Sequence, residues 1–333
     1  MTIGNQTRKA TDDQIIEAWK KSQSTTAVAR MVKISTRALA TRIARLRGRG
    51  ISLLSADTRS PYYSESASKA PMLITHDRVE VKLEVENGVI LVISDMHFWP
   101  NVIPTMHRAF CHLANKLKPA ATIWNGDAFD GASISRFSSI GWESKPTVSQ
   151  ELEAVKDRSA EVIKASPNSR RIWTAGNHDI RMETRLANVA PEFRNVHGLH
   201  LKDHIPEWTP AWFVTVNEGT DSHTEIRHRE KGGIHAGYNN TKESGVNIIT
   251  GHDHRADVVA YNDRRGRRYG VRAGMGADTP RDPQFVHYLE GRTANWQSAM
   301  AVLTFRNGML MQPELALKID DDSFEFRGEQ IRV

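Results

Sequence analysis

The segment 89–93, Val-Ile-Leu-Val-Ile, does most to constrain the fold of this 333-residue chain, because Asp95 and His97 follow it directly. Five consecutive apolar residues, most of them β-branched, predict a buried strand. Asp95 and His97 are two residues apart, so both side chains can leave the end of the strand on the same side. A carboxylate and an imidazole at the carboxyl end of a buried strand are typical of the beginning of a metal site.

The same arrangement recurs three times further along the chain, where an apolar strand is again followed by residues of metal-binding types. The repeats are 121–124 followed by Asp127 and Asp130, 170–174 followed by Asn177 and His178, and 246–250 followed by His252 and His254. Each polar pair alone could be a turn, a helix cap or a hydrogen-bonded core histidine. Together they lie at the same end of successive strands, where open α/β sheets bind ligands, and they predict one site.

In this order, Asp-x-His, Gly-Asp-x-x-Asp, Gly-Asn-His-Asp and Gly-His-x-His resemble the motifs of the calcineurin-like metallophosphoesterase superfamily over residues 89–275. The resemblance implies an α/β fold, a four-layer α/β/β/α sandwich of two sheets flanked by helices. The stretch 227–235, Arg-His-Arg-x-Lys-Gly-Gly-x-His, is similar to the phage-encoded branch. Asp130 is followed by Gly-Ala, not by the Arg-Gly of serine/threonine protein phosphatases, which argues against a protein phosphatase.

The resemblance also implies two divalent metal ions at the strand ends. The first would be held by Asp95, His97 and His254, and the second by Asn177, His252 and one more histidine, with Asp127 bridging the two. Mixed nitrogen and oxygen ligands suit Mn, Fe, Zn or Ni better than Ca, and Mn is our first choice.

The remaining histidine ligand has two candidates. His228 ends a strand predicted over 224–228, whereas His235 lies in or beside the helix predicted over 235–244. We prefer His228, because the family has this ligand after the strand that precedes the last motif.

The implied reaction begins with a water or hydroxide that bridges the two metals and attacks phosphorus in line with the leaving oxygen. His178 is similar to the family's catalytic histidine and would act near the leaving group, oriented by Asp179. We expect Asp130 to support a ligand histidine or the loop without binding metal itself. The cationic candidates for binding substrate phosphate, for which surface charge is the alternative, are Lys231, Arg181 and Arg255.

The N-terminal part of the chain is basic, with twelve Lys and Arg against four Asp and Glu in residues 1–60. Helical patterns begin at Thr11, Thr25 and Ser35, and the three helices resemble a helix-turn-helix, although Lys33 stands where the usual turn glycine is expected. The third helix carries the candidate DNA contacts Arg37, Arg42 and Arg45. A three-helix bundle that docks another protein is the alternative.

We therefore predict a helix-turn-helix-like DNA-binding module over 11–48, a linker over 49–71 and a metallophosphoesterase domain over 72–333. The single cysteine, Cys111, excludes an internal disulfide and fits a reducing compartment. Neither a membrane-spanning run nor a signal-peptide pattern is evident in the sequence. We expect a cytoplasmic protein with no membrane partner, in the host cytoplasm if it is phage-encoded, and the oligomeric state is left open.

Several local expectations concern the predicted catalytic domain. A strand over 75–86 and the Asn87-Gly88 pair predict a hairpin into the central strand. The insertion over 131–148 could be a lid, in which Phe137 and Trp142 either stack on a substrate base or staple the loop to the core. The acidic segment 320–329 is expected to be solvated surface.

Three functions fit these observations. The first is a dinuclear-metal-dependent phosphodiesterase or nuclease that acts on DNA and is tethered by its N-terminal module. The second is a phosphomonoesterase or small-nucleotide phosphodiesterase whose module serves regulation or assembly. The third is a non-enzymatic DNA-binding protein with a degenerate metal domain, which the intact ligand set argues against.

Overall fold

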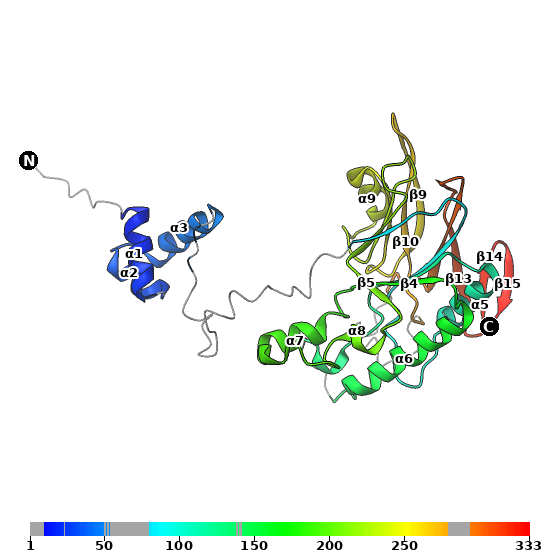
Figure 1. Cartoon of the computed structure of the whole chain (residues 1–333), viewed down its shortest axis with the longest axis horizontal. Helices are drawn as coiled ribbons and strands as arrows, with labels where there is room; N and C mark the ends of the chain where they lie inside the picture. Colours follow the sequence, from blue (N-terminus) through cyan, green and yellow to red (C-terminus); the bar gives the residue numbers. More distant parts are fainter. Residues whose placement is uncertain are drawn as a thin grey trace, which may run out of the picture. The chain divides into compact units, whose positions relative to one another are not determined.

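The structure, a computed structural model, describes residues 10–22, 24–49, 51, 53, 80–137, 139, 142–278 and 294–333. Its contacts divide the chain into two units, Met1–Asp77 and Arg78–Val333 (Figure 1). The predicted linker over 49–71 lies outside the described residues except at positions 49, 51 and 53. Within the described ranges, no helix combines the length and the apolar character needed to cross a membrane.

The N-terminal unit is a small all-α module, as predicted. Its helices are α1 (Asp12–Ser22), α2 (Thr25–Met31) and α3 (Thr36–Gly48). The Ser35 hydroxyl accepts a hydrogen bond from the backbone of Ala38 and so caps α3. Lys33 has a φ of 54° in the turn between α2 and α3, a left-handed conformation that glycine adopts more easily. The core residues include Ile15, Trp19, Val28, Leu39, Ile43 and Leu46.

The larger of the two sheets in the second unit has nine strands, ordered β15-β14-β13-β11-β2-β3-β4-β5, with β12 paired to β11. Their bounds are β2 (Gly88–Ile93), β3 (Ala121–Asn125), β4 (Arg170–Thr174), β5 (Thr209–Ala211), β11 (Ala299–Arg306), β12 (Met309–Leu310), β13 (Glu314–Asp320), β14 (Ser323–Phe326) and β15 (Glu329–Arg332). Strands β2 to β5 run parallel, so the loops that follow them emerge at the same edge.

The smaller sheet has six strands, ordered β1-β6-β7-β8-β10-β9. Their bounds are β1 (Glu80–Leu83), β6 (Phe213–Val216), β7 (Thr224–Arg227), β8 (Asn247–Thr250), β9 (Ala256–Asp263) and β10 (Gly266–Ala273). The predicted hairpin at Asn87-Gly88 is wrong, because β1 pairs in parallel with β6 while β2 belongs to the other sheet. Val81 and Leu83 are buried in the same apolar core as Ile90, which explains why β1 lies across from β2.

The four-layer sandwich is confirmed by two separate cores. Successive residues of β2 point to opposite faces, so Leu91 joins the core under the helices and Val92 joins the core between the sheets. The helices α5 (Thr105–Leu117) and α6 (Val148–Ala165) contribute to the first core. On the smaller sheet, α9 (Ala236–Ser244) lies beside β9 and β10 (Figure 1). The short helices are η2 (Ala132–Ile134), α7 (Arg181–Val189), η3 (Pro191–Phe193) and α8 (Leu201–His204).

The acidic segment 320–329 is a structured sheet edge and not simply solvated surface as expected. Strand β14 lies within it and pairs with β13 and β15. Phe324 and Phe326 are buried in the core under the helices. Phe324 and Phe326 are two residues apart, so they lie on the same face of β14. Their apolar contacts hold this edge of the sheet in place despite the charged residues around it.

Candidate metal centre

The candidate site forms where loops from both sheets meet. Strands β2, β3 and β4 are neighbours in the larger sheet, and backbone hydrogen bonds join the first two loops: Asp95 N donates to Gly126 O and His97 N donates to Asp127 O, both at 2.9 Å. In the smaller sheet, β7 and β8 also run parallel and end beside each other. Because these strands pair in parallel within each sheet, the predicted motifs that follow them come together.

Five of the predicted ligands have a backbone that side chains rarely adopt. Their φ values, all in the left-handed region, are 55° at Asp95, 42° at His97, 54° at Asp127, 71° at His252 and 58° at His254. Each such residue costs of order 1–3 kcal/mol and persists only where the surrounding structure imposes it, as it does at binding and catalytic sites. Local sequence preference alone would not produce this arrangement.

The first ligand cluster contains Asp95, His97 and His254, whose ligand atoms all lie within 4.8 Å of one another. Asp95 Oδ1 is 3.2 Å from His254 Nε2, and among the described residues it has no hydrogen-bond partner. The other oxygen, Oδ2, accepts hydrogen bonds from Ser94 Oγ and from the backbone of His252. One side of the buried carboxylate is thus anchored and the other is directed at the histidines.

The second cluster contains Asp127, His228 and His252, again within 4.8 Å. His228 Nδ1 lies 2.8 Å from Asn125 O, an arrangement in which it donates and leaves Nε2 at 3.1 Å from Asp127 Oδ2. Of the two candidate histidines, the structure brings His228 to this cluster, whereas His235 is exposed at the start of α9. The two clusters adjoin, since His228 Nε2 is 4.0 Å from Asp95 Oδ1.

The donor atoms fit two divalent cations. Although burial opposes ionisation, the charges of His228 and His254 lower the pKa of Asp95 to about 2. Burial also opposes protonation of His228, yet Asp127 and Asp95 raise its pKa to about 9. Asn177 Oδ1 is buried with no hydrogen-bond partner in the described part of the chain. Clustered carboxylates and imidazoles, together with a buried amide oxygen that has no partner, are the ligand types of Mn, Fe, Zn or Ni.

His178 lies beside these clusters and is oriented by Asp130. Its Nδ1 is 2.7 Å from Asp130 Oδ1, and the same oxygen is 2.9 Å from His97 Nδ1. Arg181 Nη1 donates to Asp130 O at 2.8 Å, and Arg181 Nη2 is 3.1 Å from His178 Nε2. Asp130 therefore supports a ligand histidine, as expected, and also contacts the candidate catalytic histidine.

Asp179 does not have the predicted role of orienting His178. Its buried carboxylate instead accepts hydrogen bonds from the backbone of Asp127, Phe129 and Gly176, at 2.8 to 3.0 Å, and from Trp173 Nε1 at 2.9 Å. These bonds tie the loop after β3 to the loop after β4. Asp179 thus holds the two loops together, and it contacts the backbone of the predicted ligand Asp127.

The three cationic candidates differ in where they lie. Arg181 contacts His178, and Arg255 directly follows His254 and is half-buried. The Lys231 ammonium, in contrast, is exposed and pairs with Glu243 of α9. This contact gives no support to phosphate binding by Lys231, and within the described residues Arg181 is the candidate that contacts a residue of the site.

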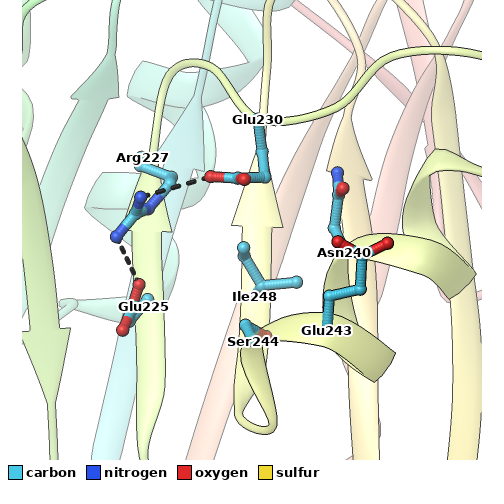
Figure 2. A pocket seen from close by; sticks show the side chains of 7 residues that line it. All are labelled: Glu225, Arg227, Glu230, Asn240, Glu243, Ser244 and Ile248. Atoms are coloured by element: carbon cyan, nitrogen blue, oxygen red, sulfur yellow. Dashed lines mark hydrogen bonds and ion pairs between the residues drawn. The ribbon is translucent and has the colours of Figure 1, made fainter. Parts of the chain in front are cut away.

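Figure 2 shows the ion pairs of Arg227, the residue that precedes His228 in the sequence. Arg227, at the end of β7, pairs with Glu225 at 2.5 Å and with Glu230 at 3.2 Å. Together with residues of α9, including Asn240, they line a polar cavity of about 340 Å³. These pairs fix the course of the chain on both sides of His228.

Sequence reasoning missed Arg272 of β10, which is only 5% exposed. It donates to Asp253 Oδ2 at 3.0 Å, to Asp257 Oδ1 at 2.9 Å and to Gly233 O at 3.1 Å. Asp253 lies between the two predicted ligand histidines of the Gly-His-Asp-His motif. Arg272 therefore joins that motif to the loop after His228, and the available signal was an arginine within the apolar part of the strand, at 269–273.

Comparisons with known proteins agree with this geometry. Residues 88–257 match the family model described as calcineurin-like phosphoesterase. The Gene 54 protein of Mycobacterium phage L5 is 27% identical over 249 residues, and the match covers 68% of this chain and 92% of that protein. The Gene 54 protein of Mycobacterium phage D29 is 25% identical over 248 residues, with the same two coverages.

Two solved structures are more distantly similar. Zinc-bound wild-type Vps29 from Entamoeba histolytica has 14% identity and a TM-score of 0.39, covering 73% of this chain and 98% of that one. The phosphoesterase YfcE from E. coli has 14% identity and a TM-score of 0.31, covering 68% of this chain and 97% of that one. From the family match and the motifs that carry it, this chain belongs to the calcineurin-like phosphoesterase family and is a metal-dependent phosphoester hydrolase.

Proposed function

We propose that this hydrolase is a phosphodiesterase that cleaves DNA and works with two divalent ions, manganese first among them. The observation that carries the proposal is that one chain joins a full set of metal-type ligands to a separate basic three-helix unit. Phosphate contacts by basic residues supply sequence-tolerant affinity for DNA, which a catalytic domain for small phosphomonoesters does not need. The phage relatives support action in the cytoplasm of an infected cell.

We assign the two metals to the two clusters of candidate ligands. Asp95, His97 and His254 would hold one ion, and Asn177, His228 and His252 the other, with Asp127 between them. When bound, the ions supply an activated water and stabilise the negative charge that develops on the phosphoryl group. Anchoring of Asp95 Oδ2 and of Asp127 Oδ1, which accepts from His178 N at 2.8 Å, holds both carboxylates in place before any ion arrives.

We assign to His178 the transfer of a proton to the leaving oxygen. Burial opposes its protonation, but the hydrogen bond that it donates to Asp130 and the charge of Asp127 raise the pKa of His178 above its usual value. With Nδ1 held by Asp130, Nε2 is the nitrogen that can face substrate. Arg181 Nη2 lies 3.1 Å from that nitrogen, and on substrate binding it would turn to a phosphate oxygen, stabilise its charge and leave Nε2 free to hold the proton.

The N-terminal unit supplies the cations for DNA. Arg37 is exposed, and the Arg45 side chain is 54% exposed although it pairs with Asp12 at 3.1 Å. Arg42 also pairs with Asp12 and donates to Ala10 O, so its guanidinium holds α1 against α3. We therefore assign the phosphate contacts to Arg37 and Arg45, and a positioning role within the unit to Arg42.

The loop that follows Asp130 supports a nucleic-acid substrate. Phe137 is 65% exposed and Trp142 is fully exposed, so neither ring staples the loop to the core. Arg136 lies over the Phe137 ring, 5.1 Å from its centroid. Exposed aromatic rings next to a cation are the elements that stack on bases and contact the adjacent phosphate.

A substrate panel tests the proposal. Purified full-length protein with Mn²⁺ is given supercoiled plasmid, linear duplex, single-stranded DNA, bis-p-nitrophenyl phosphate and p-nitrophenyl phosphate, with EDTA as the control. We expect cleavage of DNA and of the diester, and none in EDTA. Hydrolysis of p-nitrophenyl phosphate with intact DNA and diester would show a phosphomonoesterase instead. Trp142→Ala should raise KM for DNA but leave the diester rate unchanged.

A further inference from the structure

The hairpin formed by β9 and β10 ends in three exposed arginines, Arg264, Arg265 and Arg267, here called the arginine tip. We propose that the arginine tip binds the phosphate backbone of duplex DNA that flanks the site of cleavage. This inference rests on the proposed DNA substrate and adds a second contact surface, located on the catalytic unit itself.

The charge of the tip is only partly neutralised by its neighbours. Residues 262–268 contain four arginines and a single acidic residue, Asp263, although the chain beyond residue 60 has a small net negative charge. Asp263 Oδ2 pairs with the buried Arg268 at 2.5 Å, while Oδ1 accepts from the backbone of Arg265. The Arg265 side chain, 3.6 Å from Asp263, remains 69% exposed. The one acidic group is thus shared by Arg268 and Arg265, so the segment keeps a net positive charge that the exposed arginines present to solvent.

The hairpin links this charge rigidly to the metal centre. Strand β9 begins at Ala256, two residues after His254, and at the same end Gly274 N donates to Arg255 O. All eight residues of each strand are paired in register. Eight residues of strand span about 25 Å. Helix α9 supports the hairpin through a close backbone approach, since a Cβ on Gly270 would lie 1.8 Å from the Gly237 carbonyl oxygen.

The distance fits a duplex that extends outward from the scissile phosphate. Figure 1 shows the β9–β10 hairpin reaching past α9, away from the strands of the larger sheet. Because successive phosphates of one strand are about 3.4 Å apart along the helix axis, about 25 Å corresponds to roughly seven base pairs. DNA held at the metal centre would bring flanking phosphates to the arginine tip at that separation.

The neighbouring aromatic residues favour backbone contact over base stacking. Tyr238 and Tyr261 meet edge to face with centroids 5.4 Å apart. Arg268 lies over the Tyr261 ring and Lys242 over the Tyr238 ring, at 5.3 and 5.9 Å from the centroids. Each ring thus packs against the other ring and against the side chain of a cationic residue. What the surface offers a ligand is guanidinium groups, which bind phosphate oxygens.

The test compares wild type with the triple variant Arg264→Gln, Arg265→Gln, Arg267→Gln, both as full-length protein. Binding to a fluorescent 20-base-pair duplex is measured in EDTA, where no cleavage occurs, over a range of salt concentrations. Each lost phosphate contact lowers the slope of log affinity against log salt by about 0.9, so the triple variant should lose about 2.7. KM for duplex cleavage with Mn²⁺ should rise at least tenfold, while bis-p-nitrophenyl phosphate hydrolysis stays within twofold of wild type.

A matched control removes three exposed lysines from α5 and α6, with Lys116→Gln, Lys156→Gln and Lys164→Gln. This control should keep the wild-type slope. An unchanged slope and KM in the arginine-tip variant, or an equal loss in the lysine control, would overturn the inference. Failure of the proposed function has a different result: wild type would bind duplex in EDTA and cleave no DNA with any metal.

Discussion

Asp130 Oδ1 lies 2.7 Å from His178 Nδ1 and so determines which nitrogen of that ring can face substrate. The same oxygen is 2.9 Å from His97 Nδ1. Burial opposes ionisation of Asp130, but the two histidines hold the pKa of its carboxyl well below the usual value. One carboxylate therefore orients both a metal ligand and the histidine that we assign to proton transfer.

Replacement of Asp130 should affect metal binding and turnover together. Loss of a carboxylate behind a ligand histidine typically costs 10–100-fold in metal affinity or activity, so Asp130→Ala should lower both by about that amount. His178→Ala should lower kcat alone and keep the full metal content. Metal analysis and diester kinetics on both variants check this, and empty metal sites in His178→Ala would contradict its assigned role.

Asp127→Asn should abolish metal-dependent hydrolysis. Asp127 Oδ2 lies 3.1 Å from His228 Nε2, in the middle of the ligand set, and a neutral amide cannot replace its charge between two cations. His252→Ala should behave in the same way. His235→Ala is the matched control, because His235 is exposed, and it should keep wild-type activity. Calorimetric titration with Mn²⁺ measures the loss, and full Mn²⁺ binding by Asp127→Asn would refute the ligand assignment.

We predict that replacement of Asp179 lowers the stability of the fold more than it affects catalysis directly. Asp179→Ala leaves four buried donors unpaired, namely three backbone N–H groups and Trp173 Nε1. Unsatisfied buried groups cost of order 1–3 kcal/mol each, so we expect a loss of several kcal/mol in the free energy of unfolding. Thermal and urea unfolding of the metal-free protein measure it. Wild-type unfolding of Asp179→Ala combined with lost turnover would instead support the catalytic role first predicted for this residue.

Glu151 of α6 should make stability depend on pH. Burial and the charge of Asp130 raise its pKa from 4.5 to about 8, while Oε1 accepts a hydrogen bond from Ala132 N. Between these two values the folded chain binds the proton more tightly than the unfolded chain, so the free energy of unfolding falls as pH rises, by at most about 1.4 kcal/mol per pH unit. Glu151→Gln should remove this slope and be more stable than wild type above pH 8.

Urea unfolding of both proteins from pH 5 to pH 9 provides the measurement. The difference in unfolding free energy between Glu151→Gln and wild type isolates the contribution of this carboxyl from those of the other titrating groups. A difference that stays constant across the range would show that Glu151 is ionised in the folded protein.

Much of the catalytic fold follows from local sequence signals. The apolar run 89–93 and the polar pairs after each parallel strand identify the strands, their order and the edge that binds ligands, because each signal is carried by adjacent residues. The prediction of a hairpin at Asn87-Gly88 was wrong because the pairing of β1 depends on a distant part of the chain. The partner of β1 is β6, more than 120 residues further along, and no local pattern specifies that pairing.

The sequence by itself determined the chemistry of this protein: which residue types could bind metals, the strands they follow and the basic character of the N-terminal unit. Only the tertiary structure showed that His228, and not His235, lies beside Asp127 and His252. It also showed that His178 contacts Asp130 and not Asp179, and that Arg272 contacts Asp253. Each of these depends on which side chains meet across two sheets, and such contacts between distant residues are set by packing and burial, which neighbours in sequence do not encode.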